Sequence, residues 1–260
     1  MRAHGLRERL TQKPAPDEET RTIVVVDGGA ICAASHIRRF ADDGGPEAEI
    51  VWVVSWPNHE EALDLLLEHI LDSLSALPPE SILLSQELYV PVFVGMCDPW
   101  PHLRSAIRRA GFSHLPRQNE AAYAGPIHLV KKLDPPVPEV QLKRDIGKFG
   151  PRFRATLGDN TISQCECCFG FSQFESVPAM RGWVELSEIR TDGEWRSMGI
   201  GKWVVQSAIN WLHSGGYRNA ILTVAQDDEE RGAGRFYSKF GWRPICRMEK
   251  GWKRWTRRER

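Results

Sequence analysis

The stretch that decides the fold begins with Trp183-Val-Glu-Leu-Ser-Glu-Ile-Arg190, which predicts a strand running into an irregular turn. Arg196-Ser-Met-Gly-Ile-Gly201 follows and leads into a helical pattern that continues to about His213. A second strand, Ala220-Ile-Leu-Thr-Val224, precedes a second helix that carries Phe236-Tyr237. Strand, glycine turn, helix, strand and helix therefore succeed one another along this part of the chain.

The glycine turn indicates a site for a phosphate-containing ligand. Gly199 and Gly201 stand where the helix begins, and the first turn of a helix presents unpaired N–H groups and a partial positive charge. A dinucleotide fingerprint would require Gly or Ala in place of Val204, and a Walker loop would require Ser or Thr in place of Trp203. The pattern favours an acyl-coenzyme A site over a purely structural turn.

Acyl transfer from a thioester to an amine requires a base, a stabilised oxyanion and a proton for the departing thiolate. Tyr237 is the candidate acid, and its alternative role is that of a half-buried aromatic residue with a hydrated hydroxyl. Glu185 is the candidate base on the strand before the turn. Glu188 is its rival, on the opposite face if the strand is regular, and a water relay from other groups is a further alternative.

The order of these elements resembles the acetyl-CoA-binding core of the GNAT acyltransferase superfamily, most specifically over residues 180–245. In that family a tyrosine at the position of Tyr237 points at the coenzyme sulfur, and many members carry a glutamate at the spacing of Glu185. The resemblance also implies a strand bulge here and backbone pairing with the pantetheine arm. The coenzyme-binding residues that it implies are Ile189, Arg190, Thr191, Arg196, Ser197, Met198, Gly199, Ile200, Gly201, Lys202, Phe236 and Lys239.

The two halves of the chain share landmarks at a shift of about 130 residues, which indicates an internal duplication. Asp27-Gly-Gly29 falls near Gly158-Asp-Asn160, Trp52-Val53 on Trp183-Val184, Val90–Val94 on Ala220–Val224, and Gly111-Phe112 on Gly241-Trp242. The first half has no counterpart of the glycine turn and carries Ile107 where the second carries Tyr237. We therefore expect an α/β (α+β) fold of two tandem GNAT-like domains, each a mixed, mostly antiparallel sheet flanked by helices, with a degenerate first copy.

Proline-rich polar sequence at Asp134-Pro-Pro136 predicts the domain boundary. The predicted division is an N-terminal tail over 1–20, the degenerate domain over 21–134 and the acetyl-CoA-binding catalytic domain over 135–260. A helical spacing over 60–77 predicts the main helix of the first domain.

Composition excludes several classes of function. The formal charge of the 260 residues is zero, which argues against nucleic-acid binding, and no run of 18 apolar residues could span a membrane. The charged N-terminus lacks the apolar centre of a secretory signal, and six scattered cysteines suit reduced thiols, so we expect a cytoplasmic protein. Cys165-x-Cys167-Cys168 has no second Cys or His pair nearby, so core thiols are favoured over a metal site.

These observations predict an N-acetyltransferase that uses acetyl-CoA as the acyl donor, without a metal. A primary amine, on a small molecule or a peptide, would attack the thioester directly in a ternary complex. The alternative function is that of a non-catalytic acyl-CoA sensor or interaction protein. The identity of the amine, the acyl-chain length and the oligomeric state are left open, with a homodimer as one option.

Overall fold

The computed structural model describes residues 19–42, 45–75, 81–87, 93–115, 119–129, 134–171 and 177–256. Contacts between residues divide the chain into two compact units, Met1–Ala121 with Cys246–Arg260, and Ala122–Ile245. This division differs from the predicted boundary at 134 because the last strand of each half of the chain lies in the other unit. Of the predicted tail, residues 1–18 lie outside the described residues, and Glu19 and Thr20 open the first strand.

The first unit is built on a mixed sheet in the order β1-β2-β3-β4-β14-β6. Its strands are β1 (Glu19–Asp27), β2 (Ala30–Asp42), β3 (Gly45–Ser55), β4 (Ser81–Leu84), β14 (Trp252–Trp255) and β6 (Ser113–His114). The short strand β5 (Met96–Cys97) pairs instead with β13 (Arg243–Glu249), at the edge of the other sheet. The helices are α2 (Glu60–Ser75) and α3 (Pro101–Arg109). Gly28 and Gly29 have positive φ and form the predicted turn between β1 and β2.

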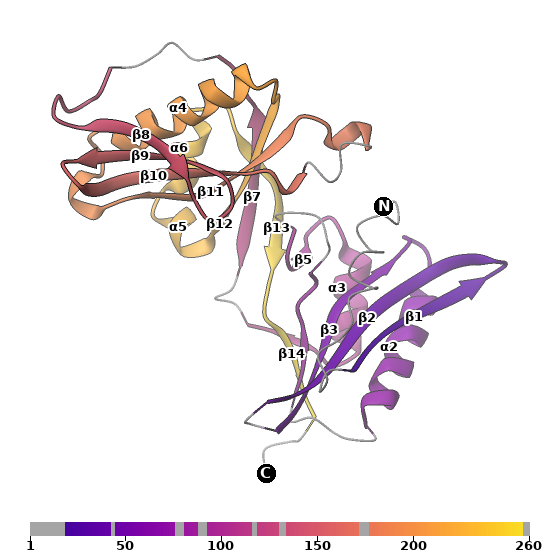
Figure 1. Cartoon of the computed structure of the whole chain (residues 1–260). Helices are drawn as coiled ribbons and strands as arrows, with labels where there is room; N and C mark the ends of the chain where they lie inside the picture. Colours follow the sequence, from indigo (N-terminus) through magenta and orange to yellow (C-terminus); the bar gives the residue numbers. More distant parts are fainter. Residues whose placement is uncertain are drawn as a thin grey trace. The chain divides into compact units, whose positions relative to one another are not determined.

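The helix predicted over 60–77 is confirmed as α2, which lies alongside β1, β2 and β3 in Figure 1. Its spacing of apolar residues buries one stripe against the sheet. The buried residues of this stripe are Leu63, Leu66, Leu67, Ile70 and Leu74.

The second unit is built on the strand order β13-β7-β12-β11-β10-β9-β8. These strands are β7 (Glu120–Pro126), β8 (Gln141–Ile146), β9 (Pro151–Leu157), β10 (Asn160–Cys168), β11 (Trp183–Thr191), β12 (Asn219–Ala225) and β13 (Arg243–Glu249). The helices are α4 (Ile200–Ser214), α5 (Gln226–Glu230) and α6 (Ala233–Ser238), with short 3-10 turns η3 (Pro178–Met180) and η4 (Gly193–Trp195). Figure 1 shows α4 along the strands β9, β10 and β11. None of the helices in the described parts of the chain is both long and apolar enough to cross a bilayer.

The two units share one order of connections. In each, antiparallel strands are followed by a crossover helix and a parallel strand: β1-β2-β3-α2-β4 in the first unit and β9-β10-β11-α4-β12 in the second. Strand β7 ends the first half of the chain and lies between β12 and β13, whereas β14 ends the second half and lies between β4 and β6. The shared order of connections confirms the predicted architecture of two similar mixed sheets, whereas the reciprocal exchange of their closing strands was not predicted.

The shift between the two halves is not constant, so one landmark of the predicted duplication is wrong. The parallel pairing of β11 with β12 begins at Trp183, and that of β3 with β4 begins at Ala48. The counterpart of Trp183 is therefore Ala48 and not Trp52. The connection from β10 (ending at Cys168) to β11 (beginning at Trp183) is longer than the one from β2 (ending at Asp42) to β3 (beginning at Gly45), so the shift has already grown at Trp183. The second unit then inserts η4 and the glycine turn, which increases the shift again before α4.

A second landmark is also wrong. The first-unit counterpart of β12 is β4, because each pairs in parallel with the strand before the crossover helix. The segment that the sequence proposed, Val90–Val94, lies outside the described residues at 90–92, and Val94 forms only an isolated antiparallel bridge with Glu87.

The C-terminal strand should therefore stabilise the N-terminal unit. Trp252 is 1% exposed within the core of the first unit, whereas Trp255 on the same strand is 61% exposed. We expect Trp252→Ala to cost about 3–5 kcal/mol in the free energy of unfolding, measured in urea, and Trp255→Ala to cost about 1 kcal/mol or less. Hydrogen exchange should locate the loss for Trp252→Ala in α2 and α3. Exchange that accelerates only within residues 122–245 would contradict this assignment.

Candidate functional site

Strand β11 carries a bulge where it faces β10. Gln164 pairs with Arg190 and Glu166 pairs with Ser187, so β11 contains an extra residue, and Glu188 adopts a φ of 49°. This confirms the bulge that the resemblance implied. Because a bulge interrupts the alternation of side chains, the simple expectation that Glu188 and Glu185 lie on opposite faces does not apply.

The parallel strands β11 and β12 share only a short register. It runs from the pair Trp183 and Asn219 to the pair Glu185 and Ile221, although β11 continues to Thr191 and β12 continues to Ala225. Beyond this register, the edge of β11 that faces β12 can bond to an extended, amide-containing ligand.

The turn before α4 leaves several backbone amides without helical hydrogen-bond partners. Ser197 has a φ of 63° and Gly199 has a φ of 84°, and no side chain caps the helix. The first helical bond runs from the Trp203 N–H to the Gly199 carbonyl, so the amides of Ile200, Gly201 and Lys202 precede the helical ladder. Such amides, aligned with the positive end of the helix dipole, can bind an anion.

Gly201 allows α4 to lie against the end of β11. A Cβ atom at this position would stand 2.7 Å from the Thr191 Oγ1. That hydroxyl is held by the Ser163 Oγ at 2.9 Å, and the Arg196 Nε donates to the Thr191 carbonyl over 3.1 Å. The structure thus brings the predicted residues Thr191, Arg196 and Gly201 together.

Tyr237 lies on α6 within a cluster of aromatic rings. Its ring centroid is 5.9 Å from that of Tyr123, 6.1 Å from Trp242 and 5.1 Å from Phe236. Burial, with smaller effects of Cys165 and Asp228, raises the pKa of the Tyr237 phenol above its ordinary value. The phenol is therefore protonated at neutral pH and can donate a proton.

Tyr123 reaches this cluster from β7 and is anchored at its hydroxyl. The Tyr123 Oη donates to the Glu229 Oε1 over 2.6 Å. The first turn of α6 approaches this hydroxyl closely, since a Cβ atom at Gly234 would stand 2.5 Å from it. Tyr123 thereby holds the start of α6 against the strand next to β12.

Glu185 lies directly opposite Cys168 in the pairing of β11 with β10. Burial raises the pKa of the Glu185 carboxyl above its ordinary value of 4.5, and a hydrogen bond with the Cys168 thiol partly offsets this effect. No interaction joins Glu185 to Tyr237 directly among the residues described. A substrate or a water molecule would have to connect the two groups.

Most of the other predicted coenzyme-binding residues lie on the end of β11, the glycine turn and the start of α4, whereas Phe236 lies on α6 and Lys239 at its end. Arg190, Arg196, Ser197, Met198, Lys202 and Lys239 are exposed, Ile189 and Phe236 are half-buried, and Ile200 is fully buried. Ile200 therefore contributes to the site through its backbone amide, while its side chain packs in the core.

Two of the three cysteines of β10 are core thiols, as predicted. Cys165 and Cys167 are fully buried, and burial raises the pKa of Cys167 to about 12, whereas Cys168 is only partly buried. Over the described ranges, no group of three or more Cys, His, Asp or Glu residues is arranged to hold a metal ion.

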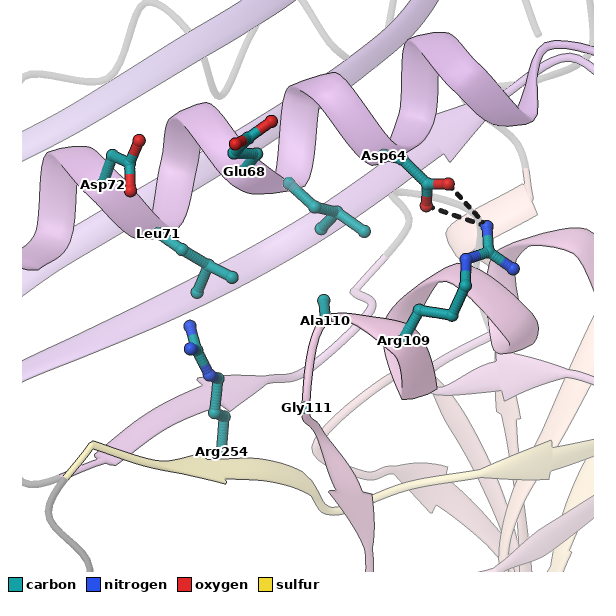
Figure 2. A pocket seen from close by; sticks show the side chains of 9 residues that line it. Asp64, Glu68, Leu71, Asp72, Arg109, Ala110, Gly111 and Arg254 are labelled. Atoms are coloured by element: carbon teal, nitrogen blue, oxygen red, sulfur yellow. Dashed lines mark hydrogen bonds and ion pairs between the residues drawn. The ribbon is translucent and has the colours of Figure 1, made fainter.

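The first unit has a groove of about 520 Å³ that contains none of the predicted site residues. Figure 2 shows it between α2, the end of α3 and β14, with Arg254 pointing into it. Asp64, Glu68 and Asp72 follow one another along α2, and Asp64 accepts both bonds of an ion pair from Arg109 at 2.8 and 2.9 Å. Charges of both signs line this groove, so its surface favours neither an anion nor a cation.

Sequence reasoning missed two residues of the second-unit site. Tyr123 fell in the segment interpreted as a proline-rich boundary, although the run Glu120-Ala-Ala-Tyr-Ala-Gly125 is apolar enough to have indicated a strand. Cys168 was interpreted only as a core thiol, and its contact with Glu185 depends on a register that the sequence alone does not fix.

Comparisons with known proteins agree with this geometry. The sequence model of the acetyltransferase (GNAT) family matches residues 151–242. No curated protein sequence matches the chain. The fold is similar to that of a tandem GNAT protein from the clavulanic acid biosynthesis pathway, with 12% identity, a TM-score of 0.62, and coverage of 98% of this chain and 88% of that chain.

Two further structures share the fold. A GCN5-related N-acetyltransferase from Sphaerobacter thermophilus has 12% identity and a TM-score of 0.61, with coverage of 98% of this chain and 86% of that chain. A GCN5-related glucosamine N-acetyltransferase region of a fungal multi-domain GH3 β-N-acetylglucosaminidase has 14% identity, a TM-score of 0.60 and coverage of 90% of this chain. This chain spans only 33% of that protein.

Residues 151–242, most of the second unit, thus match the GNAT acetyltransferase family by sequence, and the fold of the solved GNAT structures agrees with this match. The second unit belongs to the GNAT superfamily, and the chain as a whole has the architecture of two GNAT-like sheets.

The close approach of α4 to β11 can be tested at Gly201. We expect Gly201→Ala to weaken coenzyme A binding about tenfold or more in calorimetry, because the added Cβ must displace the Thr191 hydroxyl and shift the amides of the turn. Gly193→Ala is the matched control, since a Cβ there meets nothing within 4 Å. Thr191→Ala removes the obstructing oxygen and should restore binding in the double variant. Equal affinities of Gly201→Ala and the wild type would contradict this account.

Proposed function

We propose that the chain is an N-acetyltransferase that transfers an acetyl group from acetyl-CoA to a primary amine. One observation supports this proposal above the others: the free amides at the start of α4 lie beside the edge of β11. The amides suit a diphosphate and the strand edge suits the pantetheine arm, so the two together would direct a thioester toward the middle of the sheet.

Coenzyme binding would use three groups of residues. The backbone of Ile189, Arg190 and Thr191 would pair with the pantetheine amides. The turn from Arg196 to Lys202 would hold the diphosphate through backbone N–H groups, and the exposed Arg196 and Lys202 would add positive charge. Phe236 and Lys239 would border the coenzyme from α6.

The amine would attack the thioester carbonyl directly. Glu185 would accept a proton from the amine, and the new C–N bond would form a tetrahedral oxyanion near a β11 amide. The oxyanion would then collapse with cleavage of the C–S bond, and the Tyr237 hydroxyl would protonate the departing thiolate. The products are an amide and free coenzyme A, and water would return the proton from Glu185 to Tyr237.

The environments of the two groups support these opposite roles. Burial raises both pKa values, which keeps the Tyr237 phenol protonated and brings the Glu185 carboxyl closer to neutral pH. A base works best when its pKa lies near the working pH, and a donor must retain its proton until the thiolate forms. The acceptor would be a primary amine on a small molecule or a peptide.

A non-catalytic acyl-CoA sensor is the alternative, and Tyr237 separates the two functions. We expect Tyr237→Phe to bind coenzyme A normally but to lower kcat about 10²-fold or more, measured as thiol release from acetyl-CoA with a panel of amines. Tyr217→Phe, which lies beyond the C-terminal end of α4, should retain full activity. Coenzyme binding by the wild type without turnover on any amine would favour the sensor.

The base predicts a pH dependence. Activity requires ionised Glu185, so kcat/KM should fall as the pH is lowered through the raised pKa of this carboxyl, above its ordinary value of 4.5. Glu185→Gln should lower kcat/KM about 10²-fold and remove this acidic limb, whereas Glu188→Gln should keep it. An acidic limb that persists in Glu185→Gln would indicate a water relay from other groups.

A further inference from the structure

In the second unit a gap follows the short parallel register of β11 with β12. In the first unit a side chain fills the equivalent gap between β3 and β4. The register of β3 with β4 ends at Leu84, and that of β11 with β12 ends at Ile221. Two residues beyond these positions stand Gln86 in the first unit and Thr223 in the second. Gln86 and Thr223 therefore occupy equivalent positions in the two sheets, and the first has a long carboxamide side chain where the second has a short hydroxyl.

The Gln86 side chain bonds to β3 as an extended backbone would. Its Nε2 donates to the Val53 carbonyl over 2.7 Å, and its Oε1 accepts from the Val53 N–H over 3.0 Å. The side chain is fully buried, with 0% exposure. A carboxamide offers the same donor and acceptor as a peptide group, so this one side chain satisfies both polar groups of Val53.

Backbone bonds on either side fix Gln86 in place. The Ser85 N–H donates to the Ile50 carbonyl over 3.1 Å, and the Glu87 N–H donates to the Val51 carbonyl over 2.7 Å. Gln86 itself has a φ of 50°. This left-handed conformation is unfavourable for a residue with a Cβ atom, so the surrounding bonds determine it.

The start of α2 is also unlike the start of α4. Glu60 and Glu61 occupy the first turn of α2, and Pro57, shortly before it, has no N–H group to offer. The first turn of α4 carries no acidic residue and follows Gly199. Carboxylates at a helix N-terminus occupy the place of a bound anion and repel a diphosphate.

We propose that Gln86 is a built-in substitute for the secondary amide of an extended ligand. The first unit then retains a ligand slot between β3 and β4 but closes it with its own side chain, and the chain binds one coenzyme, in the second unit. Removal of the side chain opens the slot to a compound with a secondary amide, such as pantetheine. The inference concerns the first unit and does not depend on the catalytic roles proposed for the second.

Gln86→Gly tests the slot without straining the backbone, because glycine favours the φ that this position adopts. The variant leaves the Val53 N–H and carbonyl unpaired, so we expect Tm to fall by roughly 5 °C. Millimolar pantetheine should then raise Tm more in the variant than in the wild type, since any binding to the second unit is common to both. Leu66→Ala destabilises the same unit with Gln86 intact, and its response to pantetheine should equal that of the wild type.

Any of three results would overturn the inference. The first is a Gln86→Gly variant whose Tm and pantetheine response match those of the wild type. The second is protection of residues 50–55 by coenzyme A in hydrogen exchange of the wild type, and the third is a calorimetric stoichiometry of two coenzymes per chain. We expect protection of residues 186–191 and 199–203 only. Protection of neither segment would contradict the proposed function while leaving the first unit closed, so the two failures are distinguishable.

Discussion

The contact between Gly201 and Thr191 is the constraint on which the second-unit site depends. It sets how near the start of α4 lies to the end of β11, because no Cβ atom intervenes and the Thr191 hydroxyl is held by Ser163. The N-terminus of α4 supplies unpaired amides, and β11 supplies a strand edge freed from β12 beyond Glu185. Neither alone would select an acyl-coenzyme A, since helix termini bind many anions and strand edges bind many peptides. The distance between the start of α4 and the edge of β11 determines which ligand can bind to both at once.

Because of the exchange of closing strands, neither half of the chain contains all the strands of its own sheet, so the two units are not independent domains. Each sheet lacks the strand beside its parallel pair until the other half of the chain supplies it, β7 for β12 and β14 for β4. The supplied strands carry buried aromatic residues, Tyr123 on β7 and Trp252 on β14. Much of the apolar surface that stabilises each unit is therefore encoded in the other half of the sequence.

Local patterns in the sequence were sufficient for several helices and strands and for the glycine turn on which the proposed site is built. The spacing over 60–77 predicted α2, and the two glycines predicted the turn before α4, because periodicity and positive φ are local properties. The landmarks at Trp52 and Val90–Val94 were wrong, and the division by contacts differs from the predicted boundary at 134, because both depend on how distant strands pair. For the same reason the sequence did not show the contacts of Tyr123, Cys168 and Gln86, although the strand that carries Tyr123 could have been predicted. Each acts through a partner fixed by register, and a register is set by the whole sheet.

The comparison of the two units separates what the fold provides from what individual side chains decide. Both units carry a bulge in the strand before the crossover helix, and both end the parallel register shortly afterwards. The fold therefore offers the same gap twice. A buried Gln86 amide fills it in the first unit, where two unpaired backbone groups would otherwise be costly. Thr223 is too short to do so in the second unit, which must satisfy the edge of β11 with water or a ligand. The first half of the chain then contributes to the site through β7, whose Tyr123 packs against Tyr237.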